Sequence, residues 1–211
     1  MIFDLDGTLI DNFGAIYESY RYALERLGIP NRSFAEVKKT VGGSVEVTMG
    51  KFVPPDQVER GVALFRERYD EVWSHDLNLL DGVAETLPRL VAMGLQLGIA
   101  TNKRGEFARK TIEHLGIPKY FIGVIGVLDV PRPKPHPDMI VRLLQLMQLP
   151  AEEVVLIGDS PFDIEVARAA NVRVWCLPTG THDGKELEGH KPNLVFSRFS
   201  ELPDLIAGKK N

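Results

Sequence analysis

The pattern of apolar and polar positions is helical over the first third of the chain. A short apolar run, "MIF", precedes it. In "FGAIYESYRYALERL" the apolar residues recur at helical spacing, Asn12 stands where an N-cap is expected, and Gly28 and Pro30 end the segment. Further helices are expected after the capping box "SFAE", after "VGGS" and from Pro54 to about Ser74. The block 13–78 thus reads as all-helical, without a strand.

The pattern changes after this block. From "LLDGVAETLPRLVAMG" onward, helices alternate with short apolar runs, which are "LQLGIA", "YFIGVIGV", "EVVLIG" and "VRVWCL". Runs that are apolar on both faces and separated by helices predict a parallel sheet covered on both sides. "MIF" belongs with these strands. We therefore expect an α/β core formed by residues 1–12 and 79–211, interrupted by a helical domain at 13–78.

Composition limits the possible functions of the chain more than it limits the possible folds. The 211 residues are 44% hydrophobic and 26% charged, with a formal net charge of −4, so no basic excess favours nucleic acid or an anionic membrane surface. The single cysteine, Cys176, lies in an apolar stretch and is expected to be buried. The five histidines are not paired at zinc-ligand spacing. No stretch is long enough to span a membrane, and a cytoplasmic protein is expected.

Candidate chemistry gathers directly after the apolar runs. In open parallel sheets, ligands bind beyond the carboxyl ends of the strands. Asp4 and Asp6 follow the first run and face the same way in an extended segment, so they repel each other unless a cation or a proton intervenes. The other runs are followed by polar residues as well: Thr101 and Asn102, Lys134, and Asp159, Ser160 and Asp163.

This set of side chains fits phosphoryl transfer through an aspartate. Asp4 can act as a nucleophile that forms an aspartyl-phosphate, and Asp6 as the acid and base. Thr101 and Lys134 would hold the non-bridging oxygens. A magnesium ion between Asp4 and Asp159 would relieve the repulsion between the carboxylates.

Each of these features also has a structural interpretation. Asp4 to Gly7 can be a strand end with an Asp-Gly turn, and Thr101 and Asn102 can simply cap the next helix. "GDSPFD" has the form of a helix start, with Ser160 at the cap, Pro161 first and Asp163 in the first turn. Lys134, in a proline-stiffened loop, can be a solvated surface residue. The functional hypothesis rests on all these strand ends pointing to one place.

The motifs "DLDGTL", "TN", "KPHPD" and "GDSPFDIEVARAAN", in this order, resemble the haloacid dehalogenase-like hydrolase superfamily over essentially the whole chain. The resemblance implies a Rossmann-like core with an inserted all-helical cap. It implies that Asp4 is the nucleophile, Asp6 the acid and base, and Thr101 and Lys134 the phosphate holders. It also implies Mg²⁺ on Asp4, Asp159 and the main-chain oxygen of Asp6, with Asp163 as a ligand or just behind the ligands.

Within the superfamily, "ATNKR", "RPKPHPD" and "PTGTHDGKEL" are most similar to phosphoglycolate phosphatases. True dehalogenases lack the second aspartate, so Asp6 favours phosphate chemistry. The chain departs from the family in having only three residues before the nucleophile, and in having Asn171 where a glycine usually ends a helix. Asparagine tolerates the left-handed conformation required there.

Substrate selection is expected in the cap, at "VGGS". Gly42 and Gly43 allow backbone to approach a ligand, and Ser44 can begin a helix whose free amides suit an anion, although a plain interhelical turn explains the same residues. We expect a phosphatase for a small phosphorylated metabolite, acting as a monomer or homodimer, with Asn102 also at the substrate. The alternatives are a phosphomutase of the β-phosphoglucomutase kind and a non-catalytic binding or regulatory protein on the same fold.

Overall fold

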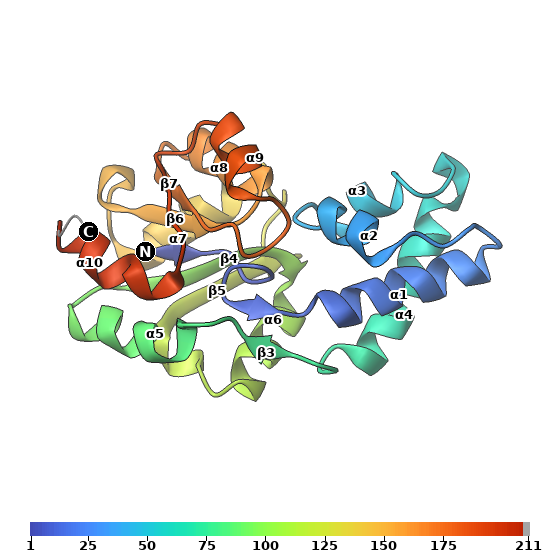
Figure 1. The fold of residues 1–211 in the computed structure, drawn as a ribbon, viewed down its shortest axis with the longest axis horizontal. Helices are drawn as coiled ribbons and strands as arrows, with labels where there is room; N and C mark the ends of the chain where they lie inside the picture. Colours follow the sequence, from blue (N-terminus) through green and yellow to red (C-terminus); the bar gives the residue numbers. More distant parts are fainter. Residues whose placement is uncertain (209–211) are drawn as a thin grey trace.

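The computed structural model describes residues 1–208 and contains a six-stranded parallel sheet (Figure 1). The strand order is β5-β4-β1-β6-β7-β8, so the first strand lies in the middle of the sheet between two strands that follow it by many residues. This is the topology that places a ligand site beyond the carboxyl ends of the central strands. The strands are β1 (Ile2–Phe3), β4 (Leu97–Arg104), β5 (Phe121–Val127), β6 (Val155–Gly158), β7 (Arg173–Cys176) and β8 (Leu194–Val195).

Helices cover both faces of this sheet and bury its two apolar surfaces. Ile2 and Phe3 are both fully buried but point into different hydrophobic clusters, as alternation along a strand requires. Phe3 packs with the helices α5 (Val83–Ala92), α6 (Gly105–His114) and α10 (Leu202–Ile206), and Ile2 with α7 (Asp138–Met147), α8 (Pro161–Ala169) and α9 (Gly184–Gly189). Single 3-10 turns occur at η2 (Pro118–Tyr120), η3 (Ala151–Glu153) and η4 (Phe199–Glu201).

The segment between β2 and β3 forms a helical insert that projects from the carboxyl ends of the strands (Figure 1). Its interior is aromatic: Tyr20 packs on Phe65 with ring centroids 4.5 Å apart, and Phe65 stacks on Tyr69 at 5.7 Å. Tyr69 also meets Phe107 of α6 edge-on at 5.3 Å, which joins the insert to the core. The elements are α1 (Phe13–Arg26), α2 (Phe34–Thr40), α3 (Val45–Met49), η1 (Pro55–Gln57) and α4 (Val58–Val72).

A two-stranded antiparallel ribbon lies where the chain enters and leaves this insert. β2 (Ile10–Asp11) pairs with β3 (Asn78–Leu79). The expectation that residues 13–78 contain no strand is therefore wrong at Asn78, the last residue of that block. Two residues are too short to produce a periodic pattern, so the ribbon follows from pairing between distant segments rather than from local sequence.

Asn12 is the N-cap residue of α1, as expected, but its side chain makes no capping hydrogen bond. The carboxylate of Asp11 accepts a hydrogen bond from the Phe13 N–H at 3.1 Å instead. The Asn12 side chain donates to the Trp73 carbonyl at 2.9 Å and accepts from the Tyr69 hydroxyl at 2.6 Å. Asn12 thus ties the start of the insert to its end.

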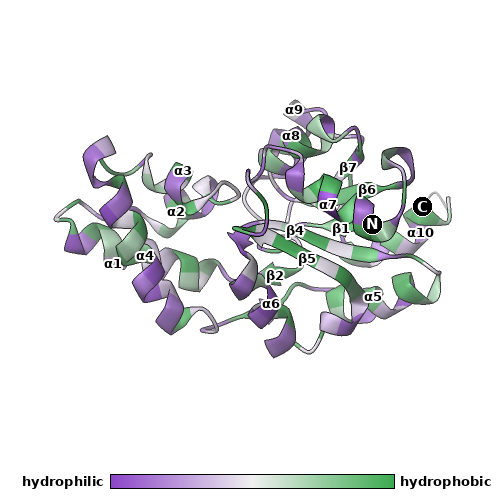
Figure 2. Ribbon diagram, turned by 180° about the vertical axis from the view of Figure 1, so that it is seen from behind, coloured by the Kyte–Doolittle hydropathy of each residue, from purple (hydrophilic) through white to green (hydrophobic). Residues whose placement is uncertain are grey.

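Several local predictions agree with the structure. Ser33 and Glu36 form the expected capping box, and Asn171 adopts φ +55°, the left-handed conformation expected for it. Cys176 is buried. Figure 2 shows apolar residues concentrated in the sheet and on the helix surfaces that face it. Within residues 1–208, no helix combines the length and the apolar character needed to cross a bilayer.

Candidate active site

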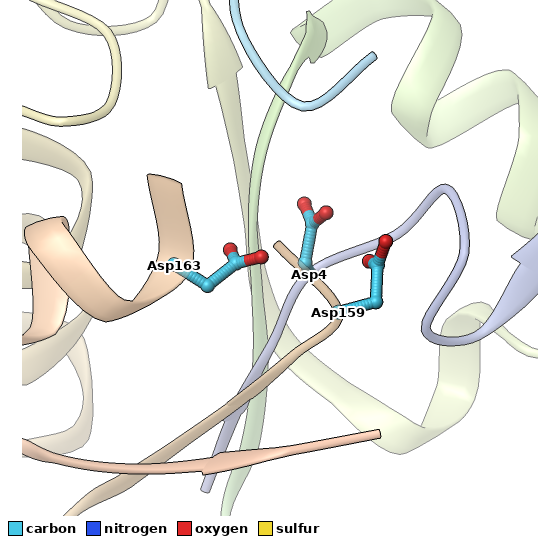
Figure 3. Close-up of side chains that lie close together, drawn as sticks. All are labelled: Asp4, Asp159 and Asp163. Atoms are coloured by element: carbon cyan, nitrogen blue, oxygen red, sulfur yellow. The ribbon is translucent and has the colours of Figure 1, made fainter. Parts of the chain in front are cut away.

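Three buried carboxylates meet at the carboxyl ends of the two central strands. Asp4 follows β1, Asp159 follows β6, and Asp163 lies in the first turn of α8. One oxygen of each lies within 4.8 Å of the others, as the close-up in Figure 3 illustrates. The exposed fraction of each residue is 6% or less. The sheet topology therefore unites residues that are more than 150 positions apart in the chain.

The ammonium of Lys134 is buried among these acids. Its Nζ lies 3.0 Å from Asp4 Oδ1 and 2.7 Å from Asp163 Oδ1, and its side chain is 1% exposed. The interpretation of Lys134 as a solvated surface residue is wrong. The loop is anchored because the Lys134 N–H donates to Asn102 Oδ1 at 3.0 Å.

One ammonium does not balance three carboxylates, and the protonation equilibria reflect this excess. Burial raises the pKa of Asp4 to about 6, opposed by Lys134 and reinforced by Asp163. Burial and the neighbouring acids Asp163 and Asp4 also raise the pKa of Asp159 well above its ordinary value. Burial would lower the pKa of Lys134, but Asp163 and Asp4 outweigh it and raise that pKa. Hard oxygen donors with surplus negative charge suit a divalent cation such as Mg²⁺.

Asp159 is held by two threonines that the sequence did not single out. Thr8 Oγ1 donates to Asp159 Oδ1 at 3.0 Å, and the Thr181 N–H donates to Oδ2 at 2.9 Å. A Cβ built on Gly180 would lie 1.9 Å from Oδ2, so only glycine fits beside this carboxylate. Thr181 lies in "PTGTHDGKEL", a segment similar to that of the phosphoglycolate phosphatase group. Nothing in the residue types around Thr181 indicates a contact with a carboxylate.

The first residues of α8 both cap the helix and contribute Asp163 to the acidic cluster. Ser160 is the N-cap, Pro161 is the first helical residue, and Asp163 Oδ2 accepts hydrogen bonds from the Ser160 N–H at 3.1 Å and from Ser160 Oγ at 2.6 Å. Asp163 uses its other oxygen for Lys134. Both predicted features, the helix start and the acidic cluster, are therefore present together.

Thr101 and Asn102 do not cap a helix, because β4 continues through them and α6 begins only at Gly105. Thr101 is buried and lines the same pocket as Asp4 and Asp6. Asn102 is a bridge: its Nδ2 donates to the Gly42 carbonyl at 2.8 Å and to the Lys134 carbonyl at 3.2 Å. It joins the Lys134 loop to the insert.

The predicted glycine loop of the insert lies over the start of α8. Gly42 has φ +113°, and a Cβ there would lie 3.2 Å from Phe162 and Ser160. Ser44 is the N-cap of α3, as expected, but that helix has only five residues and Ser44 Oγ accepts from the Val47 N–H at 3.4 Å. The loop therefore packs against the start of α8 rather than being exposed as a free turn.

A pocket opens between the insert and the core at this point. Asp4, Asp6 and Thr101 line it from the core, and the glycine loop Gly42–Ser44 lines it from the insert. Charged residues that also line it are Glu46, Arg66, Lys103 and Arg104. The sequence did not single out Lys103, which forms an ion pair of 3.0 Å with Asp6 Oδ1.

Comparisons with known proteins agree with this architecture. Residues 1–177 match the family model described as haloacid dehalogenase-like hydrolase. A phosphoglycolate phosphatase of Nitrosococcus oceani is 30% identical over 98% of this chain and 96% of its own length. The protein named "Putative pyrophosphatase PpaX" of Caldanaerobacter subterraneus subsp. tengcongensis is 30% identical over 99% of this chain and 94% of its own. The crystal structure of a predicted phosphoglycolate phosphatase from Haemophilus somnus superposes with a TM-score of 0.89 at 26% identity, covering 97% of this chain and 96% of that one.

Proposed function

The chain belongs to the haloacid dehalogenase-like hydrolases, and from this premise we propose that it is a magnesium-dependent phosphatase that hydrolyses a small phosphorylated metabolite through a phosphorylated Asp4. The observation that carries the proposal is the buried cluster of Asp4, Asp159 and Asp163, in which Lys134 Nζ pairs with Asp4 and Asp163. Asp4 also lines a pocket together with Asp6 and Thr101.

In the first half of the proposed reaction, an oxygen of Asp4 attacks phosphorus as the bond from phosphorus to the ester oxygen breaks. Asp6 gives its proton to that leaving oxygen, so the alcohol departs neutral. In the second half, Asp6 takes a proton from water as the water oxygen bonds to phosphorus. The bond from phosphorus to Asp4 then breaks, which releases inorganic phosphate and restores the carboxylate.

Thr101 and Lys134 hold the non-bridging oxygens in this proposal. The hydroxyl of Thr101 and the ammonium of Lys134 are both buried, where a fixed donor or charge interacts more strongly with developing negative charge than it does in water. Asp163 positions Lys134, since the two share a hydrogen bond of 2.7 Å.

Mg²⁺ would be held by Asp4, Asp159 and the main-chain oxygen of Asp6, with Asp163 as a further ligand or behind them. The fit rests on the donor set: three buried carboxylates against one ammonium leave a surplus of negative charge. When bound, the cation supplies charge neutralisation that allows an anionic phosphate ester to approach an anionic nucleophile.

For the substrate class, we propose a compact phosphate ester of the phosphoglycolate type. The support is the activity of relatives such as the phosphoglycolate phosphatase of Nitrosococcus oceani, and a pocket in which Arg66, Lys103 and Arg104 stand beside the acids Asp4, Asp6 and Glu46. The substrate would contact Gly42, Gly43 and Ser44 of the insert and Asn102 of β4, which line the same pocket.

The test is a hydrolysis panel of phosphorylated metabolites, including phosphoglycolate and inorganic pyrophosphate, with Mg²⁺ and with EDTA. We expect Mg²⁺-dependent release of inorganic phosphate, fastest for a small ester. Conversion of a sugar phosphate to its isomer without phosphate release would identify a mutase instead. Absence of turnover across the panel would favour a binding protein on this fold.

A further inference from the structure

Lys103, which the proposed reaction does not use, is the centre of a buried polar network. Its Nζ lies 3.0 Å from Asp6 Oδ1, 2.6 Å from the Tyr69 hydroxyl oxygen and 3.2 Å from Asn12 Oδ1. Its side chain is 6% exposed. The ammonium also lies 4.8 Å from the centre of the Tyr69 ring.

The network joins parts of the molecule that are distant in sequence. Asp6 belongs to the loop after β1, Lys103 to β4, Tyr69 to α4 of the insert, and Asn12 to the linker into the insert. The Tyr69 hydroxyl donates to Asn12 Oδ1 at 2.6 Å, so Lys103, Tyr69 and Asn12 form a closed set of contacts. The position of the insert therefore affects the surroundings of Asp6 through Tyr69 and Lys103.

The donor count argues that Lys103 holds Asp6 rather than a substrate. The ammonium donates hydrogen bonds to the Tyr69 hydroxyl and to Asn12 Oδ1, and Asp6 Oδ1 lies 3.0 Å away as its counter-charge. Asp6 Oδ1 is itself buried and accepts no well-directed hydrogen bond from any described residue, so the charge of Lys103 compensates it.

We propose that Lys103 is a positioning residue: it fixes the Asp6 carboxylate in the pocket, and Tyr69 fixes Lys103, so that correct seating of the insert places the acid and base. This inference rests on the proposed function. It assigns no contact between Lys103 and the substrate.

A neighbouring ion pair provides the matched control. Arg104 Nη2 lies 2.6 Å from Asp70 Oδ1, so this pair also joins β4 to α4. Arg104 directly follows Lys103 in the chain, and Asp70 directly follows Tyr69. This pair joins core and insert without contact to Asp6, and the Asp70 side chain is 53% exposed. Asp70→Asn therefore weakens the same junction but leaves Asp6 in place.

The experiment compares two esters that differ in their need for an acid. p-Nitrophenyl phosphate has a leaving group that departs with little protonation, whereas glycerol 2-phosphate releases an alkoxide that needs a proton. For Lys103→Met we expect kcat/KM to fall about 100-fold with glycerol 2-phosphate and about 10-fold or less with p-nitrophenyl phosphate. Tyr69→Phe, which keeps the ring, should show the same bias with a smaller loss. Asp70→Asn should change both values less than twofold.

Other outcomes would overturn the inference. Equal losses on both esters in Lys103→Met and Tyr69→Phe would indicate a general structural role, and a rise in KM with unchanged kcat would indicate direct substrate contact. A biased loss in Asp70→Asn would assign the effect to the junction as a whole. If the unaltered protein hydrolyses neither these esters nor any other ester of the panel with Mg²⁺, the proposed function fails and this inference fails with it. If it hydrolyses both and Lys103→Met shows no bias, only the inference fails.

Discussion

The carboxyl ends of the strands and the helical insert use charge in opposite ways. At the strand ends, Lys134 and Asp163 form an ion pair in which both side chains are 1% exposed. In the insert, Arg21 and Glu25 form a pair of similar length with side chains 44% and 48% exposed, over an interior of stacked aromatic rings. The insert is built as an ordinary small helical domain is, whereas the strand ends hold charges that the fold alone does not require.

This difference indicates a division of roles. A surface ion pair contributes about 0–1 kcal/mol, while a buried charge left without its partner costs about 3–5 kcal/mol. Keeping three acids and a lysine buried in the core therefore lowers the stability of the fold unless these residues bind a cation or another ligand. The insert contributes shape and a glycine loop, which suits selection of the substrate rather than the reaction itself.

The largest expected effect comes from Asp4, because the proposed reaction depends on it. Asp4→Asn should lower Mg²⁺-dependent phosphate release by about 10⁴-fold or more, as measured by the steady-state rate with p-nitrophenyl phosphate. Asp81→Asn, at an exposed turn residue of the core, is the control and should retain activity. Substantial activity in Asp4→Asn would refute its role as nucleophile.

Lys134 tests the contrast between buried and exposed charge directly. In EDTA, Lys134→Met should lower the free energy of unfolding by about 3–5 kcal/mol, because it leaves buried carboxylates without their ammonium. Arg21→Met in the insert should lower it by less than about 1 kcal/mol. Urea denaturation measures both. Similar values for the two variants would remove the energetic distinction between the regions.

The glycine loop tests whether the insert acts on the substrate. Gly42→Ala places a Cβ against Phe162 and Ser160 at a residue with φ +113°, so the loop must shift. We expect kcat/KM to fall about tenfold, and the strained φ to lower the melting temperature by about 2–4 °C. Gly189→Ala, where an added Cβ meets nothing within 4 Å, should be neutral. Unchanged kinetics in Gly42→Ala would leave the loop as a plain turn.

The smallest effect is on stability as a function of pH. The pKa of Asp4 rises from 3.8 to about 6 on folding, so the folded state binds more protons than the unfolded state between these values. Without a cation, stability should therefore fall as the pH rises through this window. Because Mg²⁺ needs ionised ligands, it should raise the melting temperature more at about pH 7.5 than at about pH 5, by about 3 °C. Calorimetry would detect the difference, and Asp4→Asn should reduce it.

The sequence predicted the strand ends well because each of their residues follows a run whose apolar pattern is strong. Asp4, Thr101 and Asp159 needed only the rule that parallel strands end at one edge of a sheet. The strands β1, β5, β6 and β7 begin and end within about three residues of the predicted runs for the same reason, and β4 continues four residues past its run, to Arg104. No run was predicted for β8 (Leu194–Val195), because two residues are too short to give a periodic pattern.

Other features depend on partners far along the chain and had no local signal. Asn12 has the residue type of a helix cap, but Trp73 and Tyr69, about 60 positions away, compete for its side chain. Lys103 looks like an exposed lysine at a strand end until Tyr69 and Asp6 are placed around it. Thr8 and Thr181 are common turn residues whose contact with Asp159 appears only in three dimensions.

The central claim is that Asp4 becomes phosphorylated, and trapping that species tests it most directly. The protein is mixed with Mg²⁺ and p-nitrophenyl phosphate, quenched in acid and reduced with borohydride, which converts an aspartyl-phosphate to homoserine. Mass spectrometry of the N-terminal peptide should then find homoserine at position 4 and unaltered aspartate at position 6. Homoserine at another position, or active turnover with no modified residue in either the unaltered protein or Asp6→Asn, would contradict the account.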